Sequence, residues 1–171
     1  NKNFTWSSGI SYTMNKEEIV DLVNGQDDVA NNWFIGKPVS SFYDYDKVGI
    51  WQTADSAAAA SVGRKPGEIR VRDVNGDKLI SAAGDRMVLG SSVPKYIHGF
   101  TNDFKLGAFD LNFYVFARQG QMFISEYAQK FEPNAIENSA RVDYWTPENP
   151  TNDYPRPNKN QENITYGSTL R

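Results

Sequence analysis

The sequence predicts an all-β fold, in which antiparallel strands form one segment of a large transmembrane β-barrel. Three stretches alternate apolar with polar side chains over about ten residues, the length at which a tilted strand crosses a bilayer. Aromatic residues make up 13% of the 171 residues, although all hydrophobic residues together reach only 39%. One very long irregular stretch and one very short connection join these strands, and a second long irregular stretch follows the last of them. This asymmetry is ordinary in outer-membrane barrels and unusual in compact soluble domains.

The first strand is predicted at residues 3–14, where the side chains follow a period of two. Phe4, Trp6 and Ile10 share one face with two further apolar residues, and the opposite face carries only small and polar residues. An antiparallel strand with one buried and one wet face would show this pattern. A transmembrane strand with lipid on one face and a watery lumen on the other would show it too.

Two further strands are predicted at residues 96–106 and 109–118, joined as a hairpin. Phe100 and Phe104 alternate with polar neighbours in the first arm. In the second arm, Phe109, Leu111, Phe113 and Val115 alternate with Asp110, Asn112, Tyr114 and Phe116. The dipeptide Gly107-Ala108 between the arms is typical of a tight turn.

Residues 15–95 and 119–171 are predicted to be long loops. The first loop contains a short helix with Thr53 as its N-cap, and a short strand at Ile69–Val71. The second loop is rich in proline, which central strands tolerate poorly.

Composition excludes several classes of function. The absence of cysteine excludes disulfides, thiolate metal sites and a cysteine nucleophile. A net charge of -3 and a pI of about 5.2 argue against a nucleic-acid-binding surface. No nucleotide-binding, metalloprotease or serine-hydrolase motif is present, and we therefore expect a protein that is not an enzyme. His98, the single histidine, lies within a strand pattern next to aromatic residues and is expected to be an interface or girdle side chain.

One motif indicates metal chemistry, because Asp73, Asn75 and Asp77 follow the spacing that opens a calcium-binding loop. Hard Ca²⁺ is bound by six to eight oxygen atoms in such loops. The alternative is a turn in which these side chains accept hydrogen bonds from their own backbone. The complete predicted set of calcium ligands is Asp73, Asn75, Asp77, Leu79, Ser81 and Asp85.

Nine stretches, taken in their order along the chain, resemble the C-terminal barrel region of the SusC/RagA family of TonB-linked outer-membrane transporters. The longest are NWFIGKPVSSFYDY at residues 32–45 and YWTPENPTNDYPR at residues 144–156. The others are residues 49–55, 66–69, 73–77, 85–91, 94–95, 99–102 and 109–111.

This resemblance implies a barrel of about 22 strands that crosses the bacterial outer membrane many times and encloses a plug. It further implies a SusD-like surface lipoprotein that closes over the barrel as a lid, and a TonB complex that acts through the plug. The imported substrate would be a glycan, an oligosaccharide or a peptide. Residues 15–95 and 119–171 would be extracellular loops, and the turn at Gly107-Ala108 would face the periplasm. Nothing in the sequence resembles the plug, and we therefore expect a fragment that acts with the remainder of the barrel.

Aromatic residues in the loops are the candidate substrate contacts, because sugar faces stack on aromatic rings. Loop packing or contact with the lipoprotein is the alternative role for these side chains. The candidates are Trp33, Tyr43, Tyr45, Trp51, Tyr144 and Trp145.

A soluble, calcium-stabilised carbohydrate-binding β-module is the alternative function. It would explain the aromatic residues and the acidic loop, but not two very long loops on one side of three strands. Dependence on detergent separates this module from a membrane barrel. A hydrolase is the third class, and only unpaired carboxylates support it.

Overall fold

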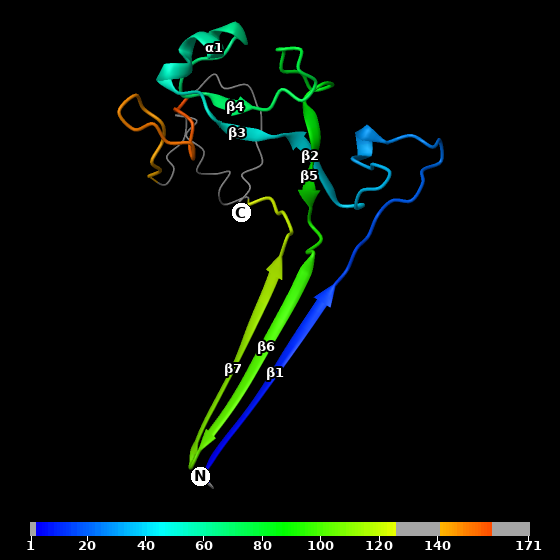
Figure 1. Cartoon of the computed structure of the whole chain (residues 1–171), viewed down its shortest axis with the longest axis vertical. Helices are drawn as coiled ribbons and strands as arrows, with labels where there is room; N and C mark the ends of the chain where they lie inside the picture. The colour runs from blue at the N-terminus through cyan, green and yellow to red at the C-terminus, as the bar shows by residue number, and fades with distance from the viewer. Residues whose placement is uncertain (1–2, 126–140, 159–171) are drawn as a thin grey trace. The chain divides into compact units, whose positions relative to one another are not determined.

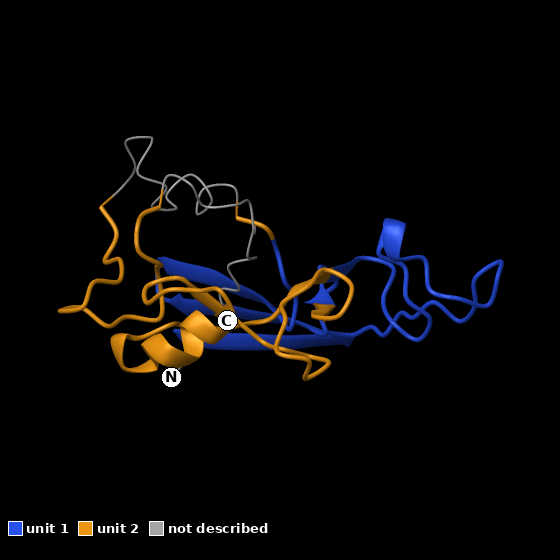
Figure 2. Cartoon of the chain, turned by 90° about the horizontal axis from the view of Figure 1, so that it is seen from above, with its two compact units in different colours: residues 1–42, 90–123 blue, residues 43–89, 124–171 orange. Residues whose placement is uncertain are grey.

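The computed structural model describes residues 3–125 and 141–158. The chain divides into two compact units, which are residues 1–42 with 90–123 and residues 43–89 with 124–171 (Figure 2). We call them unit 1 and unit 2. Antiparallel strands dominate the described residues, and helix is confined to a few short turns, which confirms the predicted all-β class. No helix in the described ranges has the length and hydropathy that a membrane-spanning helix requires.

Unit 1 is built on a sheet of three long strands in the order β1-β6-β7 (Figure 1). β1 spans Phe4–Met14, β6 spans Tyr96–Leu106 and β7 spans Phe109–Gln119, each with 11 residues. Both pairings are antiparallel. Gly107 opens the two-residue turn between β6 and β7 with a φ of 61°, a conformation that glycine adopts without steric cost.

The strand register brings the apolar side chains of all three strands to one face. Ile10 lies opposite Phe100, and Phe100 lies opposite Val115 on the other side. Residues that pair directly across an antiparallel ladder share a face, so the apolar face is continuous across the sheet. Most of its side chains are exposed in this structure, with Ile10 81% and Phe109 79% accessible, whereas Phe104 is half-buried. The large apolar members are Phe4, Trp6, Ile10, Tyr12, Met14, Tyr96, Phe100, Phe104, Leu106, Phe109, Leu111, Phe113 and Val115.

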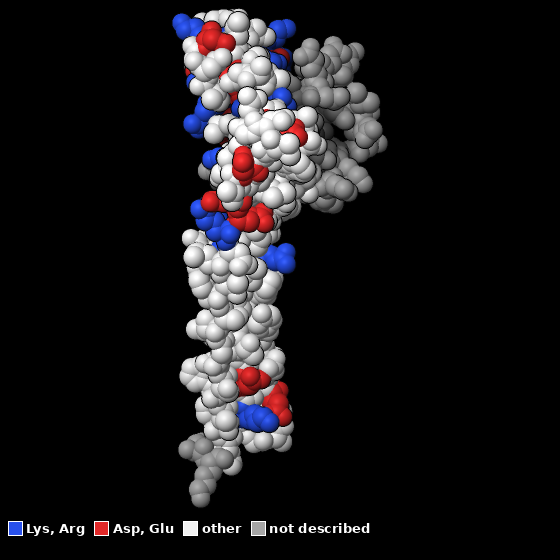
Figure 3. Space-filling view, turned by 90° about the vertical axis from the view of Figure 1, so that its right-hand side faces the viewer, with Lys and Arg blue, Asp and Glu red and all other residues white. Residues whose placement is uncertain are grey.

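Charged residues in this sheet lie only toward its ends. β1 has none, and Asp103, Lys105 and Asp110 lie near the β6–β7 turn, while Arg118 lies at the other end of β7. Lys105 Nζ is 3.7 Å from Asp110 Oδ1. Figure 3 shows the middle of the sheet without charged atoms on the face in view. An uncharged middle with charges at the ends is the pattern expected of strands that cross a bilayer.

The opposite face of the sheet is mostly polar, with Ile97 and Phe116 as its large apolar members, and it contains a close approach between β6 and β7. A Cβ atom added at Gly99 would lie 2.6 Å from Tyr114 Oη and 2.5 Å from Ser11 Oγ. Glycine is therefore required at position 99 because the Tyr114 side chain leaves no room for a Cβ atom, and not because of the backbone conformation.

We expect the substitution Gly99→Ala to destabilise unit 1 by roughly 1–3 kcal/mol, the usual cost of overpacking. The added methyl group must displace the Tyr114 ring or Ser11. Gly9→Ala is the matched control on the same face, because a Cβ atom at Gly9 would meet nothing within 4 Å. Guanidinium unfolding of the intact protein in detergent measures the difference. Equal stability of the two variants would contradict the explanation, whereas partial rescue of Gly99→Ala by Tyr114→Ser would support it.

The region predicted as the first long loop contains more regular structure than expected. β3 pairs with β4 in unit 2, and β2 pairs with β5. The strand predicted at Ile69–Val71 is present as β4, but the other three were missed because each is only four to six residues long and lacks steady alternation. The bounds are η1 Val29–Asn31, β2 Ser41–Tyr45, β3 Lys47–Ile50, β4 Ile69–Val71 and β5 Arg86–Ser91.

The predicted short helix is present, but the prediction of Thr53 as its N-cap was wrong. Thr53 is already the first residue of a 3-10 turn, η2 (Thr53–Asp55), and α1 (Ser56–Ser61) follows directly. The Asp55 N–H donates to Gln52 O at 3.0 Å, so the first turn closes on the residue before Thr53. Neither Gln52 nor Asp55, the residues at the two cap positions, makes a side-chain cap bond.

Candidate functional site

The described part of unit 2 is organised around Trp145. Its side chain is 6% exposed, and its Nε1 donates to Gln52 Oε1 at 2.7 Å. A Cβ atom at Gly67 would lie 2.5 Å from Trp145 Cε3, so the ring is in direct contact with the backbone at Gly67. Ile50 and Ala59 are also buried in this unit. Trp145 therefore anchors the segment 141–158 against residues far away in the sequence.

Polar contacts fix the same segment to β3 and to the turn that precedes β4. Arg156 Nη2 lies 2.9 Å from Glu68 Oε1, and the Arg156 N–H donates to Gly67 O at 2.9 Å. The Ile50 N–H donates to Asn152 Oδ1 at 2.9 Å. These bonds join residues about 90 to 100 positions apart, and they hold the region between η2 and β4 in a defined conformation.

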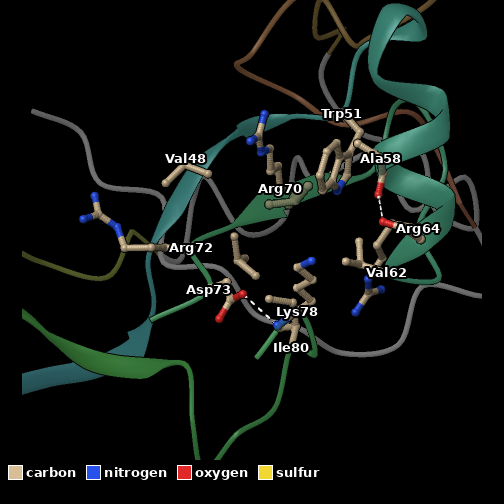
Figure 4. Close-up of a pocket in the computed structure, with 13 residues that line it drawn as sticks. Val48, Trp51, Ala58, Val62, Arg64, Arg70, Arg72, Asp73, Lys78 and Ile80 are labelled. Atoms are coloured by element: carbon tan, nitrogen blue, oxygen red, sulfur yellow. Dashed lines mark hydrogen bonds between the residues drawn. The ribbon is translucent and has the colours of Figure 1, made fainter. Parts of the chain in front are cut away.

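A pocket of about 620 Å³ lies within unit 2 (Figure 4). Arg70 contributes to it from β4, and Trp51 from the position directly after β3. Val62 and Arg64 contribute from the residues after α1, and Lys78 from the loop after β4. Its volume is within the range of small-molecule sites, which is roughly 300–1,000 Å³. The pocket combines an apolar wall with charged side chains.

Cationic side chains dominate the charged lining of this pocket. Arg64, Arg70, Arg72 and Lys78 are cationic, and Asp73 is the acidic member. Arg72 Nε pairs with Asp46 Oδ2 at 2.8 Å. Within the described ranges Arg64, Arg70 and Lys78 form no ion pair, whereas the Asp73 carboxylate accepts two backbone N–H groups. The pocket therefore has a net positive charge, although the whole chain carries -3.

The residues predicted to open a calcium loop form a compact turn in which their oxygens accept backbone hydrogen bonds. Asp73 accepts the Gly76 N–H at 2.7 Å and the Lys78 N–H at 2.9 Å. Asp77 Oδ1 accepts the Leu79 N–H at 2.7 Å, and Asn75 Oδ1 accepts the Asp77 N–H at 3.1 Å. This is the geometry of the Asx-turn alternative. The described residues contain no group of three His, Asp or Glu side chains placed to hold a metal ion, and calcium binding stays a prediction.

The side chain of Asp85 holds the two ends of this loop together by accepting backbone hydrogen bonds from both. Its carboxylate accepts the Ser81 N–H at 2.7 Å and the Val74 N–H at 2.9 Å, and the residue is buried. The Ser81 bond, more than the one from Val74, holds the pKa of the Asp85 carboxyl below its usual value, although burial opposes this effect. The ionised form of Asp85 therefore stabilises the loop.

We expect the loop between Val74 and Asp85 to loosen in acid. The pKa of Asp85 is lower in the folded chain than in the unfolded one, so its contribution is complete above the unfolded value of about 3.9. The contribution is lost as the pH falls through the lower folded pKa. Hydrogen exchange of peptides from this loop, corrected for intrinsic rates, measures the opening. Asp85→Asn is the control and should remove this pH dependence; an unchanged pH profile in that variant would contradict the assignment.

The structure distributes the predicted aromatic contacts over both units. Trp33 belongs to unit 1 and is 41% exposed, whereas the other five belong to unit 2. Trp51 lines the pocket, Tyr144 is exposed, and Trp145 is buried. Tyr43 lies under Arg86, with the guanidinium carbon 5.0 Å from the ring centroid, and Tyr45 is half-buried in β2. A substrate contact at any of these residues stays a prediction.

Sequence reasoning missed the cations of the pocket. Arg64, Arg70 and Lys78 are spread over fifteen positions, and no spacing rule connects them. The one signal in the sequence for these cations is that Arg70 and Arg72 alternate with Ile69 and Val71, which places both arginines on one face of a strand. His98, expected to be an interface or girdle side chain, lies on the apolar face of β6 beside Tyr12, with 5.2 Å between ring centroids.

Three curated TonB-dependent receptors of Formosa agariphila are similar to this chain. TonB-dependent receptor P3 is 30% identical over 181 residues, which cover 96% of this chain and 18% of that protein. TonB-dependent receptor P26 is 33% identical over 170 residues, covering 90% and 17%. TonB-dependent receptor P39 is 22% identical over 151 residues, covering 66% and 14%.

The chain thus spans less than a fifth of the length of the curated relatives that it matches. No protein-family model matches it. The strand-rich fold and the similarity to two of these proteins over nearly the whole chain lead to the same conclusion. The chain is a relative of the TonB-dependent receptors and corresponds to one segment of such a protein.

Proposed function

We propose that this chain is part of an outer-membrane barrel that imports nutrients with energy delivered through TonB. The sheet of unit 1 is the observation that carries the proposal. Its strands have 11 residues each, enough to cross the hydrocarbon layer when tilted. One face is apolar and without charge in its middle, and the other is mostly polar, as expected of a barrel wall between lipid and a watery lumen.

The edges of this sheet support a partnership with further strands. β1 and β7 each pair on one side only within the described residues. Lipid cannot satisfy the backbone N–H and C=O groups of a bare edge strand, so an open sheet does not persist in a bilayer. In this proposal, the remainder of the barrel supplies the neighbours of β1 and β7 and encloses the plug.

The lengths of the connections support an orientation in the membrane. The two-residue turn between β6 and β7 faces the periplasm, because outer-membrane barrels keep their periplasmic turns short. Residues 15–95 and 119–171 are then extracellular, and they include the pocket of unit 2. The pocket is thereby accessible to substrates outside the cell.

The finer proposal is a SusC/RagA-type transporter for glycans, oligosaccharides or peptides. The nine stretches that resemble this family support it, together with the aromatic residues in the extracellular part. A SusD-like lipoprotein acts as the lid, and the TonB complex acts through the plug. The role of the chain is transport rather than catalysis, and the relatives are named as receptors.

Fractionation and uptake measurements test this function. We expect the intact protein in the outer-membrane fraction, soluble only in detergent, and co-purified with a surface lipoprotein. We also expect its deletion to abolish uptake of a labelled oligosaccharide, and loss of TonB to do the same. A protein that is folded and monomeric in buffer without detergent would contradict the proposal and favour the soluble carbohydrate-binding module.

We also retain calcium binding by the loop at Asp73 as a proposal. Three oxygen-bearing side chains, those of Asp73, Asn75 and Asp77, lie in one turn, as a calcium loop requires. A rise in unfolding temperature with millimolar calcium, lost in Asp77→Ala, would support binding. No response to calcium would leave the Asx turn as the complete explanation of the motif.

A further inference from the structure

We propose that the pocket of unit 2 binds an anionic oligosaccharide, whose sulfate or carboxylate groups pair with Arg64, Arg70 and Lys78. This inference rests on the proposed function, because it names the substrate class for the extracellular part of the transporter. The observations that carry it are the volume of the pocket, the charge of its lining and the way its cations are held.

The first step concerns charge. Arg64, Arg70 and Lys78 line one pocket and form no ion pair within the part of the chain that the structure describes. Cations that lie together repel one another and gain by binding an anion. Arg72 is different, because Asp46 already neutralises it at 2.8 Å. The free charge of the pocket is therefore available to a ligand.

The second step concerns order. The Arg64 N–H donates to Ala59 O at 2.8 Å, which fixes the base of this side chain after α1. Arg70 lies in β4, with its guanidinium carbon 4.6 Å from the centroid of the Trp51 ring. The Lys78 N–H donates to Asp73 Oδ2 at 2.9 Å and holds the residue at a φ of 66°. Groups positioned before binding lose less entropy when the ligand arrives.

The third step concerns the class of ligand. Figure 4 shows Trp51, Val62 and Ile80 around the same space as the cationic side chains. Apolar and aromatic walls accommodate the C–H faces of sugar rings, and guanidinium groups bind sulfate or carboxylate by paired hydrogen bonds. A volume of about 620 Å³ has room for more than a single small anion. An anionic oligosaccharide satisfies both the apolar and the cationic parts of the lining.

Titration calorimetry of the intact protein in detergent tests the assignment with four probes. These are a sulfated galactan tetrasaccharide, an oligogalacturonate of the same length, a neutral galactan tetrasaccharide and a tetraglutamate peptide. We expect at least one anionic sugar to bind about tenfold or more tightly than the neutral one, with an affinity that falls as salt is added. Equal affinity for charged and neutral sugars would overturn the proposal, as would tightest binding of the acidic peptide.

Charge-removing variants locate the site. The double variant Arg64→Gln/Lys78→Gln is expected to lose about tenfold or more in affinity for the anionic sugar, because it removes two charge-assisted contacts. Lys65→Gln is the matched control, since Lys65 is adjacent to Arg64 and exposed but does not line the pocket. If the double variant binds the anionic sugar with wild-type affinity, the assignment of the binding site to this pocket is wrong.

An uptake experiment separates this inference from the proposed function. Cells that import a neutral oligosaccharide through this protein, with no binding of anionic sugars, would retain the transporter and overturn the pocket assignment. Pocket-dependent binding of the anionic sugar without any uptake would support the site and count against transport.

Discussion

Replacement of Trp145 by alanine is expected to destabilise unit 2 by about 3–5 kcal/mol, the usual cost of deleting a large buried aromatic side chain. The indole ring is 6% exposed and touches the backbone at Gly67. Its loss leaves a cavity, and it also leaves Gln52 Oε1 without the indole N–H at 2.7 Å. An effect of this size is a large fraction of the stability of a typical domain.

Denaturant unfolding and limited proteolysis of the intact protein measure this effect. Tyr144→Ala is the matched control, because Tyr144 is the neighbouring aromatic residue and is 42% exposed. We expect that variant to change the free energy of unfolding by less than about 0.5 kcal/mol, as at most exposed sites. Trp145→Phe should lie between the two, since it keeps a ring but loses the N–H donor. Similar losses for Trp145→Ala and Tyr144→Ala would show that Trp145 does not anchor this unit.

The substitution Ile10→Lys is expected to cost about 2–4 kcal/mol of stability in the membrane, because it places a charge in the middle of the lipid-facing side. Ile10 is 81% exposed on the apolar face, near the centre of β1. Gly9→Lys is the matched control, at the same depth but on the opposite face, where an added Cβ atom meets nothing within 4 Å. The amount of folded protein in the outer membrane, and its heat-modifiable migration on gels, report the outcome.

The two lysine variants distinguish a membrane barrel from a soluble sheet. A barrel tolerates Gly9→Lys and loses folded protein with Ile10→Lys. A soluble module whose apolar face is covered by other protein would be disturbed by Ile10→Lys in plain buffer, with no dependence on a membrane. Equal tolerance of both variants would exclude hydrocarbon contact at Ile10.

The sequence alone was sufficient for the features that depend on local periodicity. The three long strands follow from alternation with a period of two, which each strand carries within its own residues. The turn between β6 and β7 follows from Gly107, since a tight turn needs a residue that accepts positive φ. The strand at Ile69–Val71 and the helix after Thr53 followed from short-range signals, although the helix cap was misplaced by the preceding 3-10 turn.

Only the tertiary structure revealed the features that join distant residues. Trp145 packs on Gly67 because the chain returns to the same place after a long interval, whereas Arg64, Arg70 and Lys78 surround one pocket because the chain folds back on itself within fifteen positions. Their association depends on nonlocal packing, and no pattern in a single sequence records which distant side chains meet. Local alternation therefore determined the strands and their faces, whereas chain folding over many residues decided the core of unit 2 and the charge of its pocket.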